Sequence, residues 1–114
     1  MDRPSVFFHV TLTKNLASIL GNGLTAQAGE RSQEINDYGI FIFPNENEMD
    51  NALSNWLGES LNDQYGEDIE VSSLMITLPD DFPVSPTFVN GEESFEWYTQ
   101  SNIPACFVRF HKEQ

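Results

Sequence analysis

Near the middle of the chain an unbroken apolar run, Gly39-Ile40-Phe41-Ile42-Phe43, limits the possible folds. Because its side chains do not alternate with polar ones, the run is typical of a strand that is buried on both faces. Pro44-Asn45 closes it, and in residues 46–62 apolar side chains then recur every three or four positions, as on one face of a helix. The pattern predicts a strand covered from both sides that leads directly into a helix.

The first part of the chain predicts a strand followed by a short helix. Residues 5–12 are rich in β-branched and aromatic side chains, which favour a strand. Its alternation gives two faces: Val6, Phe8 and Val10 on one, and Phe7, His9 and Thr11 on the other. Residues 15–20 have helical spacing, with Thr13 as the expected N-cap and Gly21-Asn22-Gly23 as the stop signal.

The second half of the chain predicts four more strands, over residues 69–78, 87–89, 94–99 and 106–111. In residues 69–78 the apolar parity changes midway, so we expect a bulge near Ser72-Ser73. Asn90-Gly91 is a hairpin turn signal, and residues 106–111 favour a last strand with His111 at its exposed end. With residues 24–38 as a surface loop, the sequence predicts a single α+β domain over residues 1–114: a small, twisted, mainly antiparallel split sheet with two helices.

Composition sets the remaining limits. The chain has 114 residues, of which 39% are apolar, enough for one hydrophobic core. Its single cysteine, Cys106, lies in an apolar run and is expected to be buried, and we expect no metal site. No stretch is apolar enough to span a membrane, and Met1-Asp2-Arg3-Pro4 does not begin a signal peptide, so we expect a cytoplasmic protein.

The charge is strongly negative, at −13 from 18 acids and 5 bases. Nucleic-acid binding depends on Lys and Arg that neutralise phosphates, so direct binding to nucleic acid is not expected. Two interpretations stay open. The acids keep the surface soluble, or they present a nucleic-acid-like surface to a basic partner that the protein would inhibit.

Three segments carry residues that could act together. The first is Phe8-His9-Val10-Thr11 on a predicted strand, followed by a helix that ends at Gly23-Leu24. The second is the segment from Tyr38 to Phe43, which leads into the next helix. The third is Glu96-Trp97-Tyr98, with Ile103-Pro104 shortly after it.

In this order the three segments resemble the motifs of the ADP-ribosyltransferase-like fold. The branch in question has a His-Tyr-Glu pattern and includes the poly(ADP-ribose) polymerases, diphtheria toxin and the RNA 2′-phosphotransferases. The resemblance extends from Phe7 to Phe110, with Phe41, or a shifted Tyr38, in the place of the family's Tyr. It implies that the chain binds NAD as a substrate and transfers ADP-ribose to an acceptor it does not specify, a protein being one option.

The resemblance also implies roles for individual residues. His9, with Thr11 beside it, would bind the ribose of the nicotinamide nucleoside, and an aromatic ring would stack on the nicotinamide. The candidates for that ring are Tyr38, Phe41 and Trp56. Glu96 would stabilise the positive charge of an oxocarbenium-like transition state. If the resemblance holds, we expect His9 and Glu96 to come from adjacent central strands and to face one cleft. Arg31, in the predicted loop, would bind the pyrophosphate.

Each of these residues also has an ordinary structural interpretation. His9 fits a hydrogen-bonded core histidine, and Trp56 has the helical spacing of a core residue. Glu96 could be another solvated acid beside Glu92 and Glu93, and Arg31 a plain loop residue. The alternative function that goes with these interpretations is a non-catalytic acidic protein that binds and inhibits a basic or nucleic-acid-binding partner.

Overall fold

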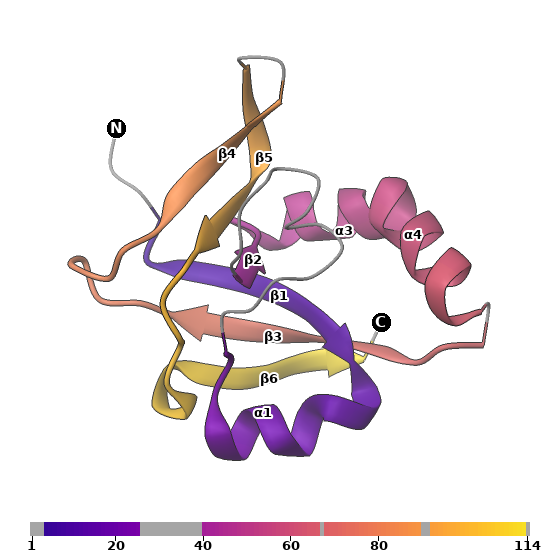
Figure 1. Cartoon of the computed structure of the whole chain (residues 1–114), viewed down its shortest axis with the longest axis horizontal. Helices are drawn as coiled ribbons and strands as arrows, with labels where there is room; N and C mark the ends of the chain where they lie inside the picture. The colour runs from indigo at the N-terminus through magenta and orange to yellow at the C-terminus, as the bar shows by residue number, and fades with distance from the viewer. Residues whose placement is uncertain (1–3, 26–39, 67, 90–91, 114) are drawn as a thin grey trace.

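The structure is a computed structural model that describes residues 4–25, 40–66, 68–89 and 92–113. Six strands form two antiparallel three-stranded sheets, in the orders β1-β3-β6 and β2-β5-β4 (Figure 1). The strands are β1 (Val6–Leu12), β2 (Ile40–Ile42), β3 (Val71–Thr77), β4 (Ser85–Val89), β5 (Glu92–Thr99) and β6 (Val108–Glu113). The helices are α1 (Leu16–Asn22), α3 (Glu46–Ser54) and α4 (Trp56–Tyr65), with 3-10 turns η1 (Thr13–Asn15) and η2 (Ala105–Phe107). The α+β class and the split antiparallel sheet are as predicted.

The two sheets meet where β1 passes the end of β2. Phe8 and Phe43 exchange both backbone hydrogen bonds, with N···O distances of 2.9 and 2.7 Å. In a continuing antiparallel ladder the next such pair would be Val10 and Phe41. The bridge between Phe8 and Phe43 stays isolated, so the strands separate there. This point is the split in the sheet, and we call it the seam.

Apolar side chains pack on both faces of the strands. Phe7 belongs to a buried cluster with Ile42, Leu74 and Ile76, against which Leu16 and Ile19 of α1 pack. The next residue, Phe8, belongs to a second buried cluster. Its other members come from the end of β2 and from helices α3 and α4: Phe43, Met49, Ala52 and Leu57. Phe7 and Phe8 therefore lie on opposite faces of β1, as the alternation in residues 5–12 predicted, and each face packs into its own cluster.

Several local predictions are confirmed. A register shift between Ser73 and Leu74 in the β3–β6 pairing is the expected bulge. β4 and β5 pair as a hairpin, whose turn residues 90–91 lie outside the described part of the chain. Gly23 ends α1 with φ of +83°, and an added Cβ there would lie 2.3 Å from the carbonyl oxygen of Ile103. Only glycine fits this position, because the chain after β5 passes directly against it.

The single helix predicted over residues 46–62 is instead two helices. The chain bends at Asn55 (φ −128°, ψ −114°), whose side-chain amide donates to the carbonyl oxygen of Asn51 at 2.8 Å. Asparagine competes with helical hydrogen bonds in this way. The bend brings α4 so near the end of α3 that a Cβ on Gly58 would lie 2.1 Å from the Leu53 carbonyl oxygen. The apolar spacing continues through the bend, which is why periodicity alone did not reveal it.

Three side-chain predictions were wrong. Thr13 does not cap α1, because it lies in η1 and its hydroxyl shares a 2.7 Å hydrogen bond with that of Ser72. Cys106 is exposed, since the apolar run around it forms η2 and not a strand, and Ile103 and Val108 take the core positions. His111 is not an exposed strand end, because its side chain is only 19% exposed.

Candidate functional site

The three candidate segments lie on strands that follow one another across the fold. β1 carries His9, β2 carries Phe41, and β5 carries Glu96. β1 meets β2 at the seam, and β2 pairs with β5 along its whole length, with Phe41 opposite Tyr98 and Ile42 opposite Trp97. Segments that are far apart in the sequence thus occupy neighbouring positions, with Phe41 in the middle.

His9 holds the edge of β2 at the seam. Its ring nitrogen Nδ1 lies 2.7 Å from the carbonyl oxygen of Phe41, at the level where the backbone N–H of Val10 would donate in a continuous ladder. A carbonyl oxygen only accepts, so Nδ1 carries the proton. In the neutral ring Nε2 is then a hydrogen-bond acceptor, and its tautomer is fixed by the protein backbone.

Glu96 is buried, with a relative exposure of 4%. This finding contradicts the interpretation of Glu96 as another solvated acid. Extending the β2–β5 register by one residue places it opposite Phe43, the residue that bridges to β1. Burying a carboxylate away from water is costly, so a buried Glu on a strand is an unusual feature of the fold.

Tyr98 lies beside Phe41 on the same face as Glu96. The two rings have centroids 6.1 Å apart and planes 30° apart, and both side chains are half-buried. Tyr98 follows Glu96 by two positions, and side chains at that spacing share a face of a strand. Sequence reasoning did not assign Tyr98 a role, although this spacing was a usable signal.

The expectation that His9 and Glu96 come from adjacent strands was wrong, because β2 lies between β1 and β5. Their strand positions also have opposite parity. His9 has the parity of Phe7, whose ring packs on Trp97 at 5.9 Å, whereas Glu96 has the parity of Tyr98. The split is what brings His9 toward β2, where its ring turns to the Phe41 carbonyl. Phe41 therefore links the two residues, through its carbonyl to His9 and through its side chain on the face of Glu96.

The other predicted site residues have mixed outcomes. Thr11 is half-buried on β1, on the same face as His9 and paired in register with Ser72. Trp56 begins α4, and its side chain lies outside the described part of the structure. Tyr38 and Arg31 also fall outside the described residues, so their predicted roles stay predictions. Trp97 packs into the core cluster of Phe7.

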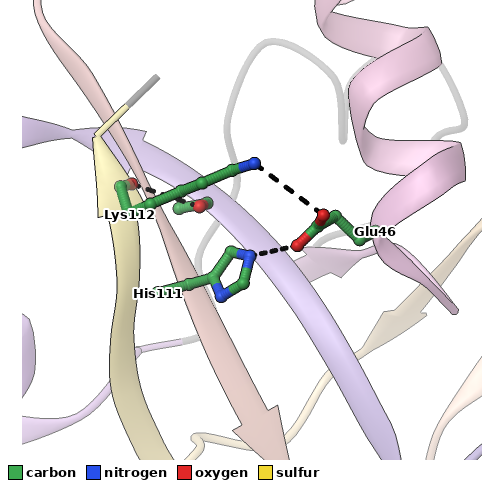
Figure 2. A network of polar contacts seen from close by, with 4 residues as sticks. Glu46, His111 and Lys112 are labelled. Carbon is green, nitrogen blue, oxygen red and sulfur yellow. Dashed lines mark hydrogen bonds and ion pairs between the residues drawn. The ribbon is translucent and has the colours of Figure 1, made fainter.

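A second polar cluster, which the sequence did not suggest, joins strand β6 to the first turn of helix α3. The Nε2 atom of His111 on β6 contacts a carboxylate oxygen of Glu46 in the first turn of α3 (Figure 2). The ammonium of Lys112 lies 3.7 Å from the other carboxylate oxygen. The ring of His111 also packs edge-on against Phe8, with centroids 5.1 Å apart. The cluster ties α3, which follows β2, to the far edge of the other sheet.

Comparisons of the chain with protein-family models, with curated proteins and with solved structures found no match. In the described part of the chain, no group of three or more His, Cys, Asp or Glu side chains is placed to hold a metal ion. No described helix is long and apolar enough to cross a membrane.

Proposed function

We propose that the chain is an ADP-ribosyltransferase-like protein that binds NAD and transfers its ADP-ribose part to an acceptor. The observation that carries the proposal is the neighbouring placement of the three motif segments, with His9 joined to Phe41 and a buried Glu96 on the next strand. Burial of a carboxyl group is costly, and a buried titratable group is a candidate for a functional site, so the burial of Glu96 supports the proposal.

The proposed reaction breaks the bond between C1′ of the ribose and the nicotinamide nitrogen. Nicotinamide leaves as a neutral molecule, positive charge develops on the ribose, and an acceptor nucleophile forms the new bond to C1′ and loses its proton. Glu96 would stabilise the developing charge, which is greatest in the transition state. His9, with Nε2 as an acceptor, would take a hydrogen bond from a ribose hydroxyl and hold the sugar in place.

The test compares the wild-type protein with Glu96→Gln, which keeps the shape of the side chain and removes its charge. We expect nicotinamide release from NAD to fall about a hundredfold or more, since one preorganised electrostatic contact is lost. Glu113→Gln, a change of an exposed acid on β6, serves as the matched control and should leave the rate unchanged. Equal rates for wild type and Glu96→Gln, at matched folded fractions, would remove Glu96 from the reaction.

One observation favours the alternative of an acidic inhibitor of a basic partner. Residues 32–108 contain no Lys or Arg, although most of the 18 acids lie there. A surface with a single sign of charge attracts a partner of the opposite sign. This function requires no NAD site, so NAD would not raise the melting temperature. A ligand-dependent rise would instead support NAD binding, because a ligand of the folded state stabilises it.

A further inference from the structure

The carboxylate of Glu46 has two partners, and both lie on β6. One oxygen contacts Nε2 of His111, and the other lies 3.7 Å from the ammonium of Lys112 (Figure 2). Glu46 belongs to the first turn of α3, and the start of this helix is fixed because the side-chain oxygen of Asn45 accepts from the Glu48 backbone N–H at 2.8 Å. The contacts therefore join a helix with a defined start to the edge strand of the first sheet.

The ring of His111 is held in place by a second neighbour. It packs edge-on against Phe8 of β1, with centroids 5.1 Å apart and planes 65° apart. Phe8 is itself buried, in the cluster that includes Phe43 and Met49. The ring of His111 therefore cannot turn away from Glu46 without also losing its contact with Phe8.

The two nitrogens of this ring have different environments. A carboxylate only accepts hydrogen bonds, so Nε2 carries a proton and donates it to Glu46, and in the neutral ring Nδ1 is the nitrogen that can take a second proton. Within the described part of the chain no residue hydrogen-bonds to Nδ1, and no buried side-chain nitrogen or oxygen lacks a partner. Nδ1 therefore reaches solvent, and it can take up a proton without breaking a hydrogen bond of the fold.

A second proton on the ring adds the attraction of opposite charges to the existing hydrogen bond. Histidine gains and loses this charge between about pH 5 and pH 8. On α3 and β6 the other charged side chains near the pair are Lys112, Glu48, Asp50, Arg109 and Glu113. On β1 and β3 the residues in register with this part of β6 carry no charge apart from His9, which lies on the opposite face of β1 from Phe8: Phe8, Val10, Ser72, Ser73, Leu74 and Met75.

We infer that the Glu46–His111 pair is a pH-sensitive connection between α3 and β6, which is stronger when Nδ1 of His111 carries a proton. The folded chain holds this proton beside a carboxylate and the unfolded chain does not. The contribution of the pair to stability is therefore greatest near about pH 6 and falls as the pH rises to about 8. Because α3 follows Phe43 at the seam, the pair controls how firmly this helix is held on the first sheet. The inference does not depend on NAD binding.

The test compares the melting temperatures of the wild type and Glu46→Gln at about pH 5.5 and about pH 8, which bracket the titration of histidine. The wild type should melt above the variant by a margin that is about 2–5 °C wider at the lower pH. Glu48→Gln is the matched control, because it removes the same charge from the same turn of α3. Its margin should be equal at the two pH values to within about 1 °C.

His111→Gln shows whether His111 is the group that titrates. Its amide N–H can still donate to Glu46, but it has no charge to gain. In this background the effect of Glu46→Gln should be the same at both pH values. His9 is present in every variant, so its titration cancels from the comparison. Equal margins at the two pH values in the wild-type background would overturn the inference, and so would a pH-dependent margin that persists in His111→Gln.

Amide hydrogen exchange provides a second measurement, which does not need the Glu46 variant. After correction for the intrinsic effect of pH on exchange, the amides of α3 in the wild type should open about two- to fivefold less often at the lower pH. His111→Gln should show no such difference. Equal opening at both pH values in the wild type would overturn the inference even if Glu46→Gln fails to fold.

Discussion

The two sheets differ in what they do with polar side chains. In β1-β3-β6, all residues of β1 pair with β3, and the buried hydroxyls of Ser72 and Ser73 bond to Thr13 and to the Lys112 carbonyl oxygen. In β2-β5-β4 the ladder between β2 and β5 is short, since β2 has three residues. The buried polar side chains described in this sheet are Thr99, whose hydroxyl donates to the Pro83 carbonyl oxygen at 2.6 Å, and Glu96. Both sheets therefore use buried hydroxyl groups to stabilise the fold, and the second also holds a buried carboxyl group. If the proposed function is right, the first sheet is the scaffold and the second bears the carboxylate of the site.

The largest effect is expected where the scaffold sheet is most tightly packed. Leu74 in the centre of β3 is completely buried, so Leu74→Ala should cost about 2–5 kcal/mol of unfolding free energy. Urea denaturation measures this cost. At a temperature where the variant is folded, its KM for NAD should equal that of the wild type. A changed KM in the folded variant would contradict the division between scaffold and site.

A second large effect is expected at Gly23, where α1 of the scaffold side passes against the chain that follows β5. Gly23→Ala would place a Cβ 2.3 Å from the Ile103 carbonyl oxygen at φ of +83°, and should cost about 2–4 kcal/mol. Gly21→Ala is the matched control. Nothing lies within 4 Å of its added Cβ, and it should stabilise α1 by about 0.5–1 kcal/mol. Equal melting temperatures for the two variants would show that the close approach of Gly23 to Ile103 does not limit stability.

A smaller effect is expected at the seam, where His9 has two separable roles. His9→Leu removes the donor to the Phe41 carbonyl oxygen and should cost about 1 kcal/mol. His9→Asn provides an amide N–H near the position of Nδ1 and should recover most of that loss. Neither variant has Nε2, so both should bind NAD more weakly than the wild type. Full NAD affinity in His9→Asn would restrict His9 to a structural role.

The smallest effect is expected in the polar cluster of Glu46, His111 and Lys112. Glu46 and Lys112 have side chains that are 42% and 46% exposed, so Lys112→Met should cost at most about 0.5 kcal/mol at low salt. High salt should remove the difference, because exposed ion pairs are screened. A larger cost that persists in high salt would show that the cluster is a main connection between the sheets.

The sequence predicted the elements of this fold better than their assembly. Strand alternation in residues 5–12 and the parity change before Leu74 are local, so β1 and the bulge in β3 were predictable. The bend at Asn55 was not, because it depends on how α4 packs against α3. Cys106 and His111 were misplaced for the same reason. The packing of residues distant in sequence, such as Glu46 with His111, decides which side chains are covered.

The candidate site shows the same limit. The order of the segments predicted that His9, Phe41 and Glu96 would act together. In the structure their strands are neighbours, with β1 next to the end of β2 and β2 next to β5. The sequence did not predict that β2 lies between β1 and β5, or that the seam opens next to His9. Both features depend on pairings between strands that are separated by many residues. Only the spacing from Glu96 to Tyr98 was local enough to be read beforehand.

Each sheet draws its strands from early and late parts of the chain, β1 with β3 and β6, and β2 with β4 and β5. Neither sheet can therefore be completed while the second half of the chain is still being synthesised. Until then the backbone N–H and C=O groups of β1 and β2 lack their partner strands. Non-local pairing of this kind slows folding and prolongs the lifetime of partly folded, aggregation-prone intermediates. It also means that a cut between α4 and β3 would give two fragments that each contain part of both sheets, and only their reassociation would restore the fold.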